Sequence, residues 1–236
     1  MPKRLAACLV TTLMVGLAAG GNAQSEALSE TMLDFHDRLR AARDALVFPD
    51  LETFQGLMGS LSLSQSALGK LPAAQQRHVQ KVRQLAASAE TATDLSSAAK
   101  LMSKVTQECG GCHRDTKGGP AFPHAPLPEE ARNSRQHMDR YRWALERMWE
   151  GLATSQPKSW RAGAAELRED TLALDTLPES ARTEAGKKLT RELHALGKQA
   201  QKAKSGSERA RMLSSIVQKC GQCHADSGVT EASGAE

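Results

Sequence analysis

The chain has 236 residues and a formal net charge of +4, and aromatic residues make up only 3% of it. So small a net charge, without a basic stripe interleaved with aromatic residues, excludes a strongly basic nucleic-acid-binding protein. The many Ala, Leu, Gln, Lys, Arg and Glu residues favour helices over strands. We therefore expect an all-α protein, and the length allows one large or two small domains.

Residues 1–23 predict an export signal. A basic start is followed by an apolar run of about 15 residues from Leu5 to Ala19, and small residues then suit cleavage before Gln24. A membrane-spanning helix needs roughly 20 apolar residues, so this run is too short to serve as an anchor. We expect a periplasmic protein with no stable membrane insertion.

Four helices are predicted between residue 24 and residue 117, over 26–47, 50–69, 72–91 and 94–113. Pro49 separates the first two, and Pro72 stands where the first turn of a helix tolerates proline. Asp94 is a suitable N-cap for the fourth helix. Residues 24–117 are therefore expected to form one unit.

A segment rich in proline and glycine follows, with the sequence GGPAFPHAPLPEE. It predicts a stiff, extended connector, which we assign to residues 118–128. Four more helices are predicted over 129–153, 157–174, 178–204 and 207–224, with Pro157, Pro178 and Ser207 as boundary signals. Residues 129–236 are expected to form the second unit.

The second unit repeats the first. The run LMSKVTQEC at 101–109 aligns without a gap on MLSSIVQKC at 212–220, and Leu71-Pro72 corresponds to Leu177-Pro178. Upstream, DRLR at 37–40 matches DRYR at 139–142, so the spacing between the copies drifts from 102 to 106 to 111 residues. Short connections favour antiparallel neighbours, so we expect two tandem up-down four-helix bundles.

The fourth predicted helix of each unit ends in a CxxCH motif. The first motif is CGGCH at 109–113, and the second is CGQCH at 220–224. CxxCH is the attachment motif of c-type haem: two thiols add to the porphyrin vinyl groups, and the following histidine binds the iron. The motifs predict two covalent haem c groups, with glycines that let the porphyrin approach the backbone. The residues concerned are Cys109, Cys112, Cys220 and Cys223 for attachment, and His113 and His224 as proximal iron ligands.

Three other interpretations of the cysteines remain. One zinc ion bound by all four would leave both histidines without a role. A thioredoxin-like dithiol needs a βαβ pattern that the sequence lacks. Two structural disulfides would suit an exported protein.

A four-helix unit with CxxCH at the end of its last helix resembles the class II c-type cytochromes, the cytochrome c′ group. The resemblance covers about residues 25–115 and 129–226. The chain departs from the family in being a tandem fusion, and in lacking the aromatic and basic tail that often follows the motif. The resemblance implies that a first-helix side chain faces the sixth position of each iron. A ligating methionine there implies electron transfer, and a nonligating residue implies gas binding.

Alignment of DRLR with DRYR places His36 opposite Met138. We predict them as distal iron ligands of the first and second haem, with Met148, Met32 and His137 as the nearest alternatives. His36 as a partly exposed helix residue and Met138 as core packing remain open. His78 is predicted to be exposed, and His194 to lie off the apolar face of its helix.

The resulting prediction is a dihaem c-type cytochrome that carries electrons between periplasmic redox proteins. The haem carries the electron and the protein adds no bond chemistry of its own, so we do not expect an enzyme. The alternatives are a gas-binding protein (nitric oxide or carbon monoxide) with an open iron site, and an electron-accepting subunit of a periplasmic oxidoreductase. A homodimer remains open.

Overall fold

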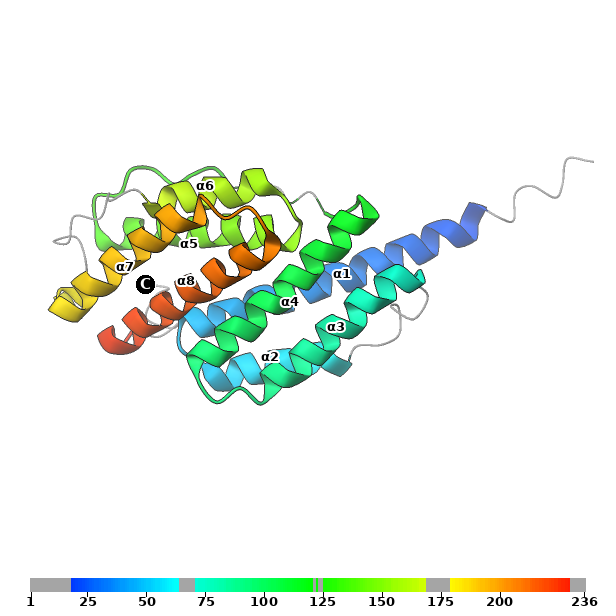
Figure 1. The fold of residues 1–236 in the computed structure, drawn as a ribbon, viewed down its shortest axis with the longest axis horizontal. Helices are drawn as coiled ribbons and strands as arrows, with labels where there is room; N and C mark the ends of the chain where they lie inside the picture. Colours follow the sequence, from blue (N-terminus) through cyan, green and yellow to red (C-terminus); the bar gives the residue numbers. More distant parts are fainter. Residues whose placement is uncertain (1–17, 64–70, 121, 123–124, 169–178, 230–236) are drawn as a thin grey trace, which may run out of the picture.

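The computed structural model describes residues 18–63, 71–120, 122, 125–168 and 179–229, and the regular structure in this part of the chain is entirely helical (Figure 1). The predicted all-α class is confirmed. The first half of the chain forms α1 (Ala18–Val47), α2 (Leu51–Leu63), α3 (Ala73–Glu90) and α4 (Leu95–Thr116). The second half forms α5 (Ser134–Ala153), α6 (Pro157–Arg168), the short 3₁₀ helix η3 (Glu179–Ala181), α7 (Glu184–Ala200) and α8 (Gly206–Ser227).

Local capping explains most of the helix boundaries. Asp94 accepts a hydrogen bond from the backbone amide of Ser97 at 2.8 Å, as its predicted N-cap role requires. Ser205 and Glu208 form a reciprocal capping box at the start of α8. The residues that follow α4 and α8, Lys117 and Gly228, are both in the left-handed region, with φ of 51° and 67°.

Some boundaries differ from the predicted ones. The first helix begins at Ala18 rather than at residue 26, so it includes residues 18–23 of the predicted signal peptide, whose other residues lie outside the described part of the chain. The fifth begins at Ser134 rather than at 129, because Asn133 accepts a hydrogen bond from the Gln136 amide at 3.0 Å and caps the helix there. The ends of the ranges predicted over 50–69 and 157–174 fall on residues that are not described.

Consecutive helices pack against one another within each half of the chain, and the two halves meet mainly through α4 and α8. These two helices lie side by side in the middle of the molecule (Figure 1). They are antiparallel, because a Cβ at Gly206, the start of α8, would lie 3.6 Å from Gln107 late in α4, and one at Gly221 would lie 3.6 Å from Leu95. The helices that carry the two CxxCH motifs therefore form the main contact between the halves.

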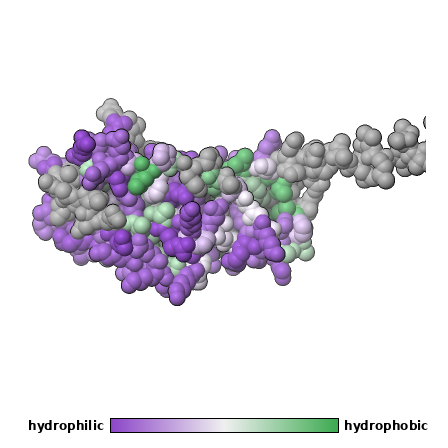
Figure 2. All heavy atoms as spheres, turned by 90° about the horizontal axis from the view of Figure 1, so that it is seen from above, coloured by the Kyte–Doolittle hydropathy of each residue, from purple (hydrophilic) through white to green (hydrophobic). Residues whose placement is uncertain are grey.

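A single apolar core runs through both halves and includes the fully buried Phe54, Met58, Trp149 and Trp160. The face seen in Figure 2 is mostly hydrophilic, with hydrophobic residues in small separate areas. Among the described residues, Leu33 and Leu127 are the exposed large hydrophobic side chains. No described helix combines the length and the hydropathy that crossing a membrane requires.

Candidate functional site

Each CxxCH motif lies in the last turns of its helix, α4 or α8, so its two cysteines are one turn apart on the same face. All four cysteines of the motifs are free thiols and are half-buried. Burial raises the pKa of the Cys109 thiol and of the Cys220 thiol to about 12. The structure therefore brings the two thiols and the histidine of each motif together at one helix end.

The histidines of the two motifs make the same hydrogen bond. Nδ1 of His113 lies 2.8 Å from the carbonyl oxygen of Ala153, and Nδ1 of His224 lies 2.8 Å from that of Val47. A carbonyl oxygen only accepts, so Nδ1 carries the proton in both rings and Nε2 keeps its lone pair. Burial lowers the pKa of both imidazoles, which favours this neutral form.

These two hydrogen bonds cross between the halves of the chain. Ala153 is the last residue of α5 and accepts from His113 on α4, whereas Val47 is the last residue of α1 and accepts from His224 on α8. The carbonyl at a helix end has no partner within its own helix, so it is free to accept from another element. Each motif is thus held by the first helix of the opposite half.

The glycine after the first cysteine makes room for this contact in both motifs. A Cβ at Gly110 would clash with the carbonyl oxygen of Leu152, and one at Gly221 would clash with that of Leu46. The next position differs, because it is Gly111 in the first motif and Gln222 in the second. The shared glycine therefore has a role that the sequence analysis did not foresee, in the packing of one half on the other.

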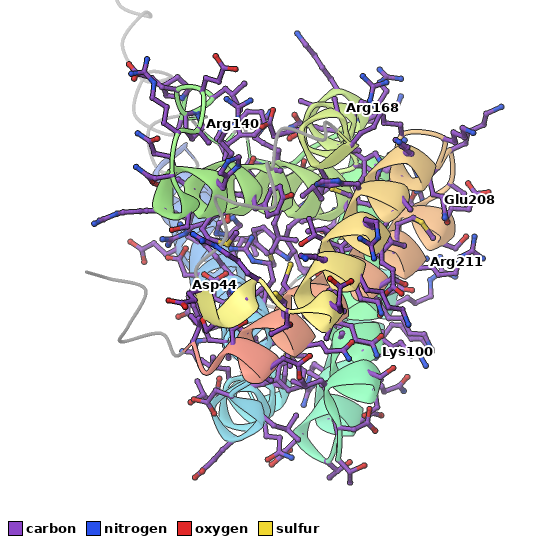
Figure 3. The ribbon with its side chains drawn as sticks, turned by 90° about the vertical axis from the view of Figure 1, so that its left-hand side faces the viewer. Asp44, Lys100, Arg140, Arg168, Glu208 and Arg211 are labelled. Atoms are coloured by element: carbon purple, nitrogen blue, oxygen red, sulfur yellow. The ribbon has the colours of Figure 1, made fainter. Side chains whose placement is uncertain are left out.

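Beside these contacts, Arg43 connects α1 with α5. Its guanidinium is almost fully buried and lies 2.6 Å from Asp44 (labelled in Figure 3) and 2.6 Å from Glu146. The same group lies over the ring of Trp149, 5.3 Å from its centroid. Burial alone would lower the pKa of Arg43, but the charges of Asp44 and Glu146 outweigh burial and raise it.

Of the predicted distal ligands, His36 lies on α1, and its ring is directed toward α5. Its ring stacks on Phe122 at 4.2 Å between centroids and lies 4.7 Å from the ring of Trp149. Nδ1 is 3.1 Å from Asp37, and within the described part of the chain the buried Nε2 has no hydrogen-bond partner. Phe122 follows shortly after Gly119, where a Cβ would lie 3.2 Å from His113. His36 and His113 therefore adjoin the same short stretch of the connector.

Met138 is half-buried, and its neighbour His137 is the more deeply buried of the two, at 1% exposure. Nε2 of His137 has no partner among the described residues. Tyr141, one turn along α5, is hydrogen-bonded to Nε2 of the buried His194 at 2.7 Å. The prediction that His194 lies off the apolar face is wrong, because it lies inside the second half and has a polar partner there.

The crossed contacts also fix which residues of α1 and α5 correspond. Val47 and Ala153 play the same part and are 106 residues apart, as are the helix starts Leu51 and Pro157. Since α1 and α5 are each continuous, this spacing holds along both helices. The alignment at 102 residues that places His36 opposite Met138 is wrong by one helical turn, and the counterpart of Met138 is Met32.

His78 is half-buried beside the first motif rather than exposed as predicted. Its Nδ1 is 3.2 Å from Glu108 and its Nε2 is 3.2 Å from Asp115. A Cβ at Gly111 would lie 3.1 Å from the imidazole. The second glycine of the first motif thus makes room for His78.

Comparison with protein-family models, curated proteins and solved structures finds no match for this chain. The described residues contain no group of three or more His, Cys, Asp or Glu side chains placed to hold a metal ion. Four ligands of a haem iron come from the porphyrin, so this finding concerns centres built from protein ligands alone, such as the four-cysteine zinc site.

Proposed function

We propose that the chain is a dihaem c-type cytochrome that carries electrons between periplasmic redox proteins. The observation that carries the proposal is the duplicated arrangement at 109–113 and 220–224. In each motif two free thiols lie one turn apart, and the adjacent imidazole has its Nδ1 proton engaged by a carbonyl. This is the tautomer that binds a metal through Nε2.

The residues present fit a covalently attached haem. The cysteines of each motif would hold it through two thioethers, and His113 or His224 would bind its iron from the proximal side. When bound, haem supplies reversible one-electron chemistry. The role of the polypeptide is to fix each imidazole, to bury the site and to set the charge around it. We propose that each half is a four-helix bundle of the cytochrome c′ type.

For the distal positions we keep His36 and Met138 as proposals. His36 has support in its orientation: the Asp37 carboxylate accepts from Nδ1, which leaves the buried Nε2 with a lone pair and no partner among the described residues. For Met138 the described contacts give no such support. Met148 and His137 on α5, and Met32 on α1, remain the alternatives for the distal positions.

The proposal is tested by making the full chain in a host that exports proteins and attaches haem c. The mature protein should be red and heavier than its polypeptide by two haem groups. Replacing Cys109 and Cys112 with alanine should remove one haem, replacing Cys220 and Cys223 should remove the other, and replacing all four cysteines should remove both. A colourless wild-type protein with the mass of its amino acids alone would refute haem binding. Two haems that neither accept electrons from reductants nor pass them to oxidants would refute electron transfer.

A second candidate function, binding of nitric oxide or carbon monoxide at one iron, is favoured by the interior of the second half. The buried His137 and His194 and the half-buried Tyr141 lie there, and polar groups near an iron site tune ligand binding. Carbon monoxide difference spectra of the reduced protein test it. A spectral change in the variant that keeps only the second haem would support gas binding, and no change in either single-haem variant would refute it.

A further inference from the structure

The end of each first helix lies against the CxxCH motif of the opposite half, and four separate contacts show this. Two are the hydrogen bonds from His113 and His224 to the terminal carbonyls of α5 and α1, both 2.8 Å long. The other two are the close approaches of Gly110 and Gly221 to the preceding carbonyls of the same helix ends. The contacts between α4 and α5 correspond to those between α8 and α1, with the roles of the two halves exchanged.

We propose that each half of the chain positions the haem-ligating histidine of the other half. The end of α1 holds His224, and the end of α5 holds His113. This inference rests on the proposed haem binding. It goes beyond that function because each haem then depends on residues far from its own motif, so neither half is complete as a haem site by itself.

Glycine is needed in each motif for this support to exist. Any side chain at Gly110 or Gly221 meets a backbone carbonyl, which cannot rotate away as a flexible side chain can. An alanine there forces α4 away from α5, or α8 away from α1, and stretches the histidine hydrogen bond one turn further on. The third position of the motif does not have to be glycine for this contact, since in the second motif it is Gln222, whose side chain is exposed.

The contact of His224 with the end of α1 differs in one respect from the contact of His113 with the end of α5. Phe48, the residue after Val47, stacks on the ring of His224, with centroids 5.2 Å apart and planes 23° apart. Its counterpart 106 residues later is Thr154, whose hydroxyl donates to the carbonyl of Glu150 at 2.7 Å instead. The first half therefore contributes an aromatic ring to the second haem's ligand, whereas no aromatic ring among the described residues of the second half stacks on His113.

The expected effect follows from the chemistry of a metal-bound imidazole. Donation from Nδ1–H to a carbonyl makes Nε2 a stronger donor to the metal, and a stronger donor favours the ferric state. Phe48 keeps the His224 ring in the plane that suits its hydrogen bond to Val47. Removing the aromatic ring weakens that bond and should raise the midpoint potential of the second haem.

The experiment compares Phe48→Leu with Thr154→Ala in the dihaem protein. Leucine keeps most of the apolar volume at a half-buried site, so the chain should still fold. Spectroelectrochemical titration gives both midpoint potentials, and single-haem proteins made by replacing the cysteines of one motif assign them. Phe48→Leu should change the ferrous-to-ferric ratio of the second haem about fivefold at fixed potential, as expected for a weakened hydrogen bond. The first haem should not respond, and Thr154→Ala should shift neither.

A response confined to the first haem, or an unchanged second haem, would overturn the crossed positioning. Gly221→Ala provides a second measurement that does not depend on Phe48, and it should shift the second haem in the same direction while Gly110→Ala shifts the first. Failure of the two proposals is distinguishable. A wild-type protein without haem refutes the proposed function, whereas a loaded protein whose second haem does not respond to Phe48→Leu refutes only the crossed positioning.

Discussion

Replacing Arg43 with methionine tests the polar connection between α1 and α5. Arg43 is almost fully buried and lies 2.6 Å from both Asp44 and Glu146. Methionine fills similar space but leaves the two carboxylates without their shared cation. We therefore expect Arg43→Met to lower the free energy of unfolding substantially.

The size of the effect follows from the exposure of the partners. Breaking a fully buried ion pair costs about 3–5 kcal/mol, because the remaining charge is stranded. The side chains of Asp44 and Glu146 are 27% and 21% exposed, so water can partly solvate them once Arg43 is gone. We expect a loss of about 2–3 kcal/mol, below the fully buried limit.

The assay is urea unfolding followed by far-ultraviolet circular dichroism, with Arg38→Met as the matched control. Arg38 pairs with Asp34 at 2.9 Å on the same helix, but both side chains are well exposed, so that variant should lose about 0.5 kcal/mol or less. In a double-mutant cycle, Arg43→Met and Glu146→Gln should show a coupling of roughly 1 kcal/mol. Equal losses for the two arginine variants, or no coupling with Glu146, would refute the reasoning.

Three further perturbations have defined outcomes. Gly151→Ala would place a methyl group against the backbone nitrogen of Trp160 in α6 and should cost about 2 kcal/mol in urea unfolding. Gly56→Ala, with nothing within 4 Å of the new methyl group, should instead add up to ~1 kcal/mol, and equal effects of the two variants would contradict the packing. Hydrogen bonds from the first turn of α2 lower the pKa of Asp50 below its ordinary 3.8, so its stabilisation is present above that pH and is lost as the pH falls through the folded-state pKa. Asp50→Ala should therefore cost about 1 kcal/mol at pH 7, and a difference from wild type that persisted in acid would count against this. In haem-free protein, iodoacetamide should label the second cysteine of each motif before the first. Burial raises the pKa of all four thiols, but the larger shifts are those of Cys109 and Cys220, to about 12; equal labelling rates by peptide mass spectrometry would exclude this.

Local signals made most of the helices predictable. Asp94 and Pro157 mark the starts of α4 and α6 within one residue, because capping and the fixed φ of proline act on the nearest turn alone. The sequence predicts the start of α5 five residues early, because the two glutamates before Asn133 favour a helix, whereas the cap formed by Asn133 starts the helix at Ser134. Helix class therefore followed from composition, and boundaries followed wherever a single capping residue decides them.

The crossed contacts were not predictable by the same route. The acceptors of His113 and His224 are backbone carbonyls, which have no residue identity, and they lie 40 and 177 positions away along the chain. The match between DRLR and DRYR was misleading because a shift of four residues keeps nearly the same helix face, so charge pattern cannot distinguish registers one turn apart. One signal was available: the first glycine is common to both motifs, and the second is not.

The crossing also sets an order of events for a chain that leaves the ribosome amino end first. Val47 is synthesised long before His224, so the acceptor of the second motif's histidine is already present when that motif emerges. His113 emerges 40 residues ahead of Ala153 and must stay without its acceptor until α5 has been synthesised and has folded. An interruption of translation just after the connector would therefore leave a fragment with an intact CGGCH sequence whose histidine has no carbonyl to accept its hydrogen bond.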